Sequence, residues 1–185
     1  GFVVTSRDNQ GQSGSRGGSG YDVFGQRYDA FGGRVGNEFL VNAAADSGSQ
    51  YEPSVIGLAN GDFVVTWRDD QGSSNDKSDT DATLGSGTDV RGQVFTTSSV
   101  ATPVETGGDF RINTFTIGNM YQHCVASVKY GWFVVTWRYV TAHDCGNSSD
   151  VYGQRFSAEG VGQGTEFRIN TEVSSHQNEP SVASL

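Results

Sequence analysis

The sequence predicts an all-β protein made of three repeats of a four-stranded, antiparallel, blade-like unit. Composition is one reason, because valine, phenylalanine, tyrosine and threonine dominate the apolar segments and favour pleated, half-buried strands over helices. Recurrence is the other reason, because four short strand-like segments return in the same order in three copies. A closed three-fold, β-trefoil-like arrangement is the alternative, since β-propellers usually have about four to eight blades.

Each copy contains the same four segments, named A to D here, which follow one another in the order B, C, D, A. Segment B is Phe2–Arg7, Phe63–Arg68 and Phe133–Arg138; C is Asp22–Tyr28, Asp89–Phe95 and Asp150–Phe156; D is Glu38–Asn42, Asp109–Asn113 and Glu166–Asn170; A is Glu52–Leu58, Gln122–Val128 and Glu179–Leu185. The links between them vary in length, as loops tolerate. We therefore divide the chain into repeat 1 (1–60), repeat 2 (61–130) and repeat 3 (131–185), which together form one repeat domain.

The segments carry strand signals of different kinds. Segment B is apolar at successive positions, so both of its faces are expected to be buried. Segment A runs through the short link Ala59–Asp62 into segment B, which is a hairpin signal. Gly25, Gly92 and Gly153 recur at one position of segment C, and this recurrence predicts a close backbone approach or a β-bulge.

The order of the segments leaves two of them without their usual neighbours. The first segment B has no preceding segment A, and the last segment A, Glu179–Leu185, has no following segment B. We expect these outer segments either to pair with each other and close a ring, or to take strands from a neighbouring copy.

The repeat consensus resembles a known family. Its Gly-Phe-Val-Val-Thr-Trp, Gly-Gln-Arg-Phe and Pro-Ser-Val-Ala elements are similar to tandem repeats of large secreted bacterial proteins described as RTX-like, adhesin-like or calcium-binding. The resemblance covers essentially the whole chain and implies an extracellular repeat module of the β-propeller type, with no implied chemistry. The middle copy departs most, because His123 and Cys124 replace the Pro-Ser pair of the other copies.

Charge and composition exclude several classes of partner. The net charge of −9 disfavours binding to the phosphates of nucleic acid. No stretch approaches the about 20 apolar residues of a membrane-spanning helix, so membrane insertion is not expected. The chain opens without an initiator methionine or a signal peptide, which suggests a processed product or a segment of something longer. An extracellular or cell-surface location is expected.

Repeated polar residues point to a structural role and not to an active site. Three arginines and three glutamines recur at equivalent positions, namely Arg7, Arg68, Arg138, Gln26, Gln93 and Gln154. A catalytic centre needs different groups that converge on one point, so catalysis is not expected. Pairing of the arginines with nearby carboxylates is the simpler interpretation.

Calcium is the one cofactor that the sequence suggests. Two groups of aspartates are candidate ligands: Asp22, Asp89 and Asp150 before each segment C, and Asp76, Asp79 and Asp81 in the long loop of the middle copy. Calcium prefers several carboxylate and carbonyl oxygens, but the spacing in the loop does not fit an EF-hand. The alternatives are that the first group closes turns onto backbone N–H groups, and that the loop is simply solvated.

The cysteines and one sequon complete the candidate sites. Cys124 begins a segment A and Cys145 lies in the loop between segments B and C of the same unit, at the same end of a meander, which predicts a disulfide. Closing that loop stabilises a fold by about 3 kcal/mol. A zinc site with His123 and His143 is the alternative. Asn147 lies in a glycosylation sequon.

These features favour an extracellular structural repeat protein that self-assembles through β-strand pairing into a fibre, sheath or surface layer. The partners are then copies of the chain itself or neighbouring repeats. The alternative is a calcium-assisted, carbohydrate- or surface-binding adhesin module, in which aromatic side chains stack on sugars. The candidates for that stacking are Tyr21, Tyr51, Tyr121, Tyr130, Trp132 and Tyr139.

Overall fold

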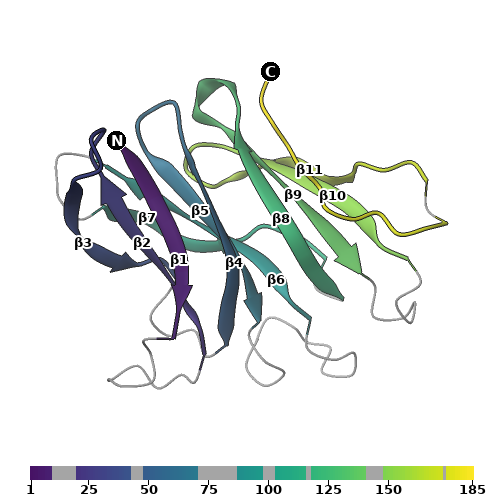
Figure 1. The fold of residues 1–185 in the computed structure, drawn as a ribbon. Helices are drawn as coiled ribbons and strands as arrows, with labels where there is room; N and C mark the ends of the chain where they lie inside the picture. The colour runs from purple at the N-terminus through teal and green to yellow at the C-terminus, as the bar shows by residue number, and fades with distance from the viewer. Residues whose placement is uncertain are drawn as a thin grey trace.

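The chain folds into three separate antiparallel sheets. The structure, a computed structural model, describes residues 1–9, 20–42, 48–70, 87–97, 103–115, 118–140, 148–172 and 174–185. Sheet 1 consists of β1 (Phe2–Asp8), β2 (Asp22–Tyr28) and β3 (Arg34–Leu40); sheet 2 of β4 (Ser49–Gly57), β5 (Phe63–Asp70), β6 (Asp89–Thr96) and β7 (Val104–Arg111); sheet 3 of β8 (Asn119–Ser127), β9 (Phe133–Val140), β10 (Asp150–Phe156) and β11 (Gly162–Arg168). In each sheet, strands adjacent in sequence are hydrogen-bonded neighbours, and the sheets lie side by side (Figure 1).

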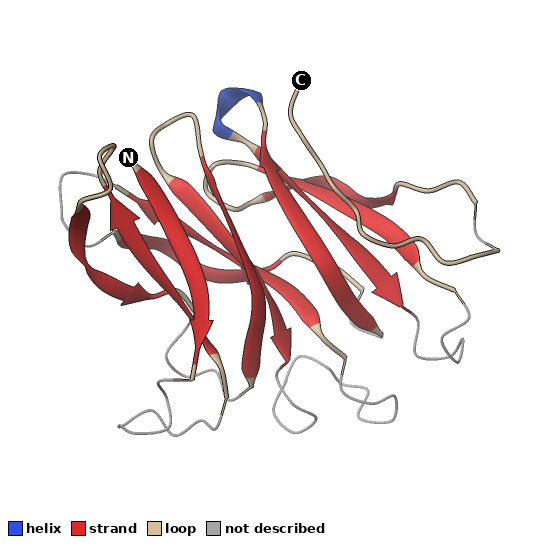
Figure 2. Cartoon of the chain, in the orientation of Figure 1, coloured by secondary structure: helices blue, strands red, loops and turns tan. Residues whose placement is uncertain are grey.

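The four repeated segments become the four strand positions of a sheet. Segment B forms β1, β5 and β9, segment C forms β2, β6 and β10, segment D contributes to β3, β7 and β11, and segment A contributes to β4 and β8. The prediction of an all-β protein with repeated antiparallel sheets is therefore confirmed (Figure 2). The third segment A, residues 179–185, is not in a strand. Within the described residues, no helix is long and apolar enough to cross a membrane.

A bulge in each sheet explains the recurrent glycine and glutamine. In sheet 2, the register between β6 and β7 shifts between Gly92 and Val94. The Gln93 amide spans this shift, donating hydrogen bonds to the carbonyls of Val94 (2.8 Å) and Thr106 (3.3 Å). A Cβ atom on Gly92 would lie 3.0 Å from the ring of Phe110. The predicted bulge is thus confirmed, and the group that approaches Gly92 closely is a phenylalanine side chain and not another backbone.

The other two sheets repeat this arrangement. The register shifts after Gly25 in sheet 1 and after Gly153 in sheet 3. Gln26 and Gln154 each donate to one carbonyl on their own strand and one on the bulged partner strand. The glutamines therefore have a structural function, as their repetition indicated.

Aromatic rings join one sheet to the next. In sheet 2, Phe63 and Phe95 stack with their ring centroids 5.0 Å apart, and Phe39 of sheet 1 tilts over both rings. In sheet 3, Phe133 and Phe156 stack at 5.2 Å. There the covering ring comes from segment D of sheet 2, as the ring of Phe110 lies 5.5 Å from that of Phe156. Each core cluster is thus built around a stacked pair and a phenylalanine from the preceding sheet.

Segment B is buried on both faces only where a sheet has a neighbour on each side. In β5, Val64 faces the core shared with sheet 3 and Val65 faces the core shared with sheet 1, and both are fully buried. The same prediction is wrong for β1, where the side chains of Phe2 and Val4 are 50% and 49% exposed. The reason is that no described residue covers the outer face of sheet 1.

The aromatic joint between sheets gives a first test. We expect Phe110→Ala to lower the free energy of unfolding by about 3 kcal/mol, because it removes the ring that covers Phe133, Phe156 and Gly92 together. Chemical denaturation measures the change. Phe31→Ala is the control and should cost less than about 0.5 kcal/mol, because the Phe31 side chain is exposed. Equal losses for the two variants would contradict the packing described here.

Candidate functional site

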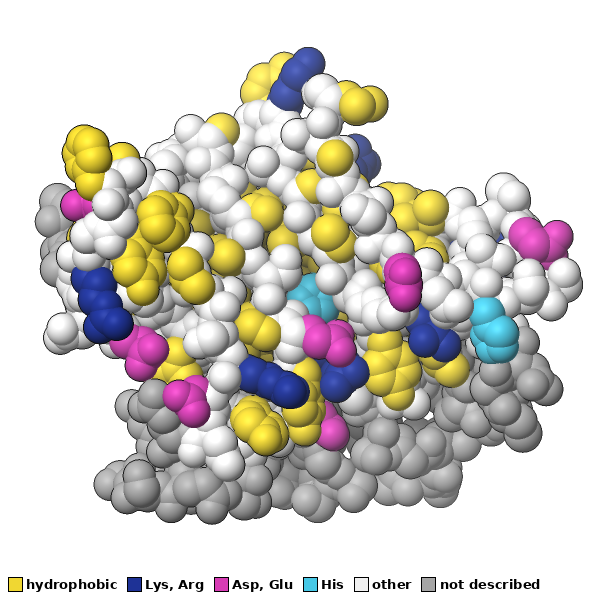
Figure 3. Space-filling view, in the orientation of Figure 1, with side chains coloured by type: hydrophobic (Ala, Val, Ile, Leu, Met, Phe, Trp, Pro, Cys, Tyr) yellow, Lys and Arg dark blue, Asp and Glu magenta, His cyan; other side chains and the backbone are white. Residues whose placement is uncertain are grey.

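Tyrosine and arginine side chains alternate in a ladder that crosses all three sheets. Its members, in spatial order, are Tyr21, Arg7, Tyr51, Arg68, Tyr121 and Arg138. Each guanidinium carbon lies 4.8–5.8 Å from the centroid of a neighbouring ring, within the range of cation–π attraction. Figure 3 shows basic and hydrophobic side chains alternating across this face of the molecule.

Strand register produces the ladder. In sheets 2 and 3, the tyrosine just before segment A pairs directly with the arginine of segment B: Tyr51 of β4 with Arg68, and Tyr121 of β8 with Arg138. The arginine then reaches the tyrosine of the following sheet, as Arg68 reaches Tyr121. Arg68 also forms the predicted carboxylate pair, at 3.3 Å from Glu52. The sequence analysis did not predict the stacking of arginine on tyrosine, although a tyrosine immediately before two of the A segments was its signal in the sequence.

A second ladder links the three A segments by hydrogen bonds from a backbone N–H of one segment to a side-chain oxygen of the segment before it. Glu52, Gln122 and Glu179 occupy equivalent positions, and all three are left-handed with φ of 53°, 51° and 53°. The Glu52 carboxylate accepts a hydrogen bond from the backbone N–H of Gln122, and the Gln122 amide oxygen accepts one from the backbone N–H of Glu179, both at 3.3 Å. Left-handed backbone is costly for such residues and persists only when the surroundings impose it. Glu179 is therefore held in the geometry of an A strand although its segment forms no strand.

The inner edge of sheet 1 is open. In sheets 2 and 3, segment A pairs with segment B, whereas among the described residues β1 pairs only with β2. A groove of about 410 Å³ lies between sheets 1 and 2 at the end where β1 begins, and it is lined by residues of β1, β2, β4 and the turn into β5, among them Phe2, Tyr28 and Val55. An unpaired edge of this kind exposes backbone donors and acceptors that can template another strand. It is the most distinctive candidate site of the described chain.

His123 lies between sheets 2 and 3, next to the Arg68–Glu52 pair. Both ring nitrogens are buried, and neither makes a hydrogen bond of ordinary geometry to a described residue. Burial lowers the pKa of His123 from 6.5 to about 4, an effect that the backbone of Thr66 and the Glu52 carboxylate partly offset and that Arg68 increases. The neutral imidazole is therefore the form that the fold accommodates.

The repeated aspartates of segment C bind asparagine side chains. The amides of Asn42, Asn113 and Asn170 donate to Asp22, Asp89 and Asp150 at 2.9, 2.7 and 2.6 Å. Each asparagine oxygen in turn accepts the backbone N–H of the valine after the aspartate, at 2.8 Å. The asparagine oxygens thus accept a backbone N–H at the start of segment C, and the turn function predicted for the aspartates stays a prediction. Within the described residues, no three His, Cys, Asp or Glu side chains gather as a metal site.

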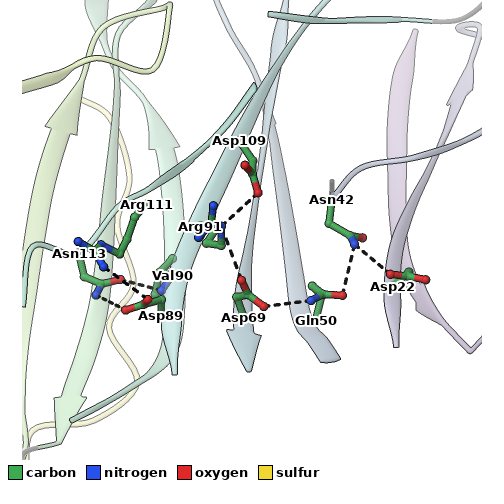
Figure 4. Close-up of polar contacts among 10 residues, drawn as sticks. All are labelled: Asp22, Asn42, Gln50, Asp69, Asp89, Val90, Arg91, Asp109, Arg111 and Asn113. Atoms are coloured by element: carbon green, nitrogen blue, oxygen red, sulfur yellow. Dashed lines mark hydrogen bonds and ion pairs between the residues drawn. The ribbon is translucent and has the colours of Figure 1, made fainter. Parts of the chain in front are cut away.

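In the first two sheets these contacts extend into a longer polar chain, drawn in Figure 4. The Asn42 amide donates to Gln50 at 3.3 Å, and the Gln50 amide donates to Asp69 at 3.0 Å. The fully buried Asp69 also lies 3.6 Å from Arg91, which forms a closer pair with Asp109 at 3.1 Å. Burial of a carboxylate is tolerated only with such compensation. The network ties Asn42 at the end of segment D in the first repeat to β4, β5, β6 and β7 of sheet 2.

Several predicted sites fall outside the described residues. They are the loop aspartates Asp76, Asp79 and Asp81, as well as Cys145, His143 and Asn147. Cys124 is a free thiol in the structure, and because Cys145 is not described, their disulfide stays a prediction. Calcium binding and glycosylation stay predictions for the same reason.

The aromatic residues predicted to stack on sugars are mostly engaged with protein groups. Tyr21, Tyr51 and Tyr121 belong to the ladder. The Tyr139 ring stacks on Phe115 at 5.8 Å, and burial raises its pKa above the ordinary value of 10.0. Tyr130 differs, because it is exposed on the turn Lys129–Gly131.

Comparison with known proteins adds no relative. No family model, no curated protein and no solved structure matches this chain. Its function must therefore be inferred from its own repeats and from the two segments that they leave incomplete.

His123 gives a pH-dependent test. Its folded-state pKa is lowered, so between pH 6.5 and about 4 the unfolded chain binds more protons. Its contribution to stability is complete above about pH 6.5 and falls by about 3 kcal/mol as the pH drops towards 4. We expect His123→Pro, which introduces the residue of the other two copies, to remove this part of the pH dependence. Denaturant unfolding at several pH values measures the free energy of unfolding of both proteins. A difference in this free energy that stays constant with pH would contradict the assignment.

Proposed function

We propose that this chain is an extracellular structural repeat protein that self-assembles through β-strand pairing, into a fibre, sheath or surface layer, and does not act as an enzyme. The observation that carries the proposal is the open inner edge of β1. The same edge of β5 and of β9 is filled by a segment A strand. Residues 179–185 have the sequence of that strand, but among the residues that the structure describes they pair with no strand.

Pairing of the open β1 edge with a further strand is expected to be favourable in free energy. Backbone groups of an unpaired edge lose little by exchanging water for another strand, and the flanking apolar side chains gain by leaving water. Phe2 and Val4 are about half exposed, whereas the equivalent Phe63 and Val65 are buried. Addition of a strand and a sheet at this edge would bury them in the same way.

The sheets support an arrangement of the β-propeller type. The innermost strands contact each other in series, β1 against β4 and β4 against β8 (Figure 1). Propellers need about four or more blades, and this chain supplies three sheets. Further units from other copies or from neighbouring repeats would therefore extend or complete the arrangement. The extracellular location rests on the resemblance to secreted repeat proteins.

The second candidate is the surface- or carbohydrate-binding module, favoured by the exposed ring of Tyr130. The ladder weighs against it, because arginines occupy faces of the tyrosine rings on which a sugar would stack. Binding to a glycan array, with and without a calcium chelator, distinguishes the two functions.

Self-assembly is tested by sedimentation over a range of protein concentrations, with electron microscopy of the assembled material. We expect Val4→Lys to weaken association by about tenfold or more, because a charge on an edge strand opposes pairing. Val104→Lys is the matched control and should associate like the unmodified chain, since Val104 has a similar exposure of 53% but lies on β7 at the opposite edge of a sheet. Dispersed monomers at every concentration would overturn the proposal, and a larger effect of Val104→Lys would assign pairing to the other edge.

A further inference from the structure

We infer that sheet 1 of a second copy of this chain follows sheet 3 as the next unit, with residues 179–185 as its missing inner strand and Phe167 as its covering ring. This joint presupposes the self-assembly proposed above, and it specifies the partner, the two surfaces and the register. Two sets of contacts point to it independently, one between sheet faces and one along a strand edge.

The aromatic contacts between sheets form a series with one step missing. Each sheet carries a stacked pair at the same place: Phe2–Tyr28, Phe63–Phe95 and Phe133–Phe156, with ring centroids 5.0, 5.0 and 5.2 Å apart. The second pair is covered by Phe39 and the third by Phe110, each from segment D of the preceding sheet. The first pair has no covering ring among the described residues.

The opposite face of the molecule carries the covering ring without its pair. Phe167 in β11 is the equivalent of Phe39 and Phe110, and its side chain is 42% exposed. Ile169 beside it is 47% exposed, whereas the equivalent Ile112 is 2% exposed. The outer face of sheet 3 therefore presents a phenylalanine and an isoleucine that could cover the stacked pair of sheet 1. Inside the chain, sheets 1 and 2 each supply such a covering phenylalanine to the sheet that follows.

The strand edges at the two ends of the chain are also complementary. Segment A pairs with segment B in one register in sheet 2, where Ser54 lies opposite Thr66 and Ile56 opposite Val64. The repeat equivalents place Ser181 of one copy opposite Thr5 of the next, with Val182, Ala183 and Ser184 opposite Val4, Val3 and Phe2 in turn. Glu179 already has the left-handed backbone of an A strand and is held there by Gln122.

The groove between sheets 1 and 2 adjoins one end of the place where this strand would run. In the predicted register, the half of the segment that follows Ser181 lies against Phe2 and Val3, which line the groove together with residues 55–57 of β4. A strand there would contact β4 as β4 contacts β8. One placement of the second copy thus satisfies the edge, the groove and the stacked pair together.

The joint is expected to be weaker than the interfaces inside the chain. Ser6 stands at the position of Trp67 and Trp137, which are fully buried. The joint therefore lacks one large apolar side chain that each internal interface has. Because its two surfaces differ, the contact is head-to-tail, and the growing assembly always keeps one free surface of each kind, unless a ring closes.

Cross-linking between copies tests the register. Cys124 and Cys145 are first replaced by serine, and Thr5→Cys is then introduced into a mass-tagged chain and Ser181→Cys into an untagged one. We expect oxidation of the mixture to produce a disulfide between the tagged and the untagged chain. The control replaces Ser181→Cys by Val182→Cys and keeps the same Thr5→Cys chain. We expect this control pair to form about tenfold less disulfide, because neighbouring residues of a strand point to opposite faces. Because each chain carries one cysteine, such a product can only join two copies.

The outcomes separate the joint from self-assembly in general. Association by sedimentation without preference for the Ser181→Cys pair would overturn this register and leave self-assembly standing. Absence of association in every variant would overturn both.

A gain of affinity provides the second measurement. We expect Ser6→Trp to lower the dissociation constant of the assembly by about tenfold or more, since it restores the residue that fills the internal interfaces. Val104→Trp, on the far edge of sheet 2, is the control for non-specific adhesion of an added tryptophan. Equal effects of the two substitutions would contradict a joint on the outer face of sheet 1.

Discussion

The strand made by segment B constrains the whole molecule, because a run of Phe-Val-Val-Thr-Trp can be buried only when both faces and both edges are covered. In sheet 2 this is achieved: β4 and β6 take the edges of β5, and the neighbouring sheets take its faces. No single unit can do this alone, since each depends on the phenylalanine of the unit before it. Stability is therefore shared between neighbours, as in other repeat proteins.

Buried polar groups follow the same periodicity. Each bulge is spanned by one glutamine, and each segment C begins with an aspartate bound by an asparagine from segment D. The hydrogen bonds of the bulge glutamines and of the aspartate–asparagine pairs lie within one unit, so this part of the pattern recurs in each of the three units. His123 breaks the repeat pattern, because it replaces a proline of the other copies with a buried imidazole. We expect it to make the interface between sheets 2 and 3 sensitive to pH, which a proline would not do.

The function proposed for the chain uses the contacts that fold it. Segment A beside segment B, and a phenylalanine over a stacked pair, are intramolecular between the three sheets and would be intermolecular at the two outer surfaces. Folding and association would then use the same kinds of contact and would differ only in how strong those contacts are. In the proposed assembly, Ser6 in place of tryptophan would weaken only the outer contact, so the chain would stay folded where the assembly dissociates.

The sequence by itself determined the strands, their order and the bulges. Alternation, glycine recurrence and collinear matches are local properties, and they located the four segments and the recurrent structural roles of Gly92 and Gln93. Only the tertiary structure decided that β1 is exposed, that Arg7 and Arg138 stack on tyrosines, and that Asp89 binds Asn113. These contacts join residues far apart in the chain, across sheets or between strands. Their partners depend on how the sheets pack and on which copy lies outermost, and no local pattern encodes either.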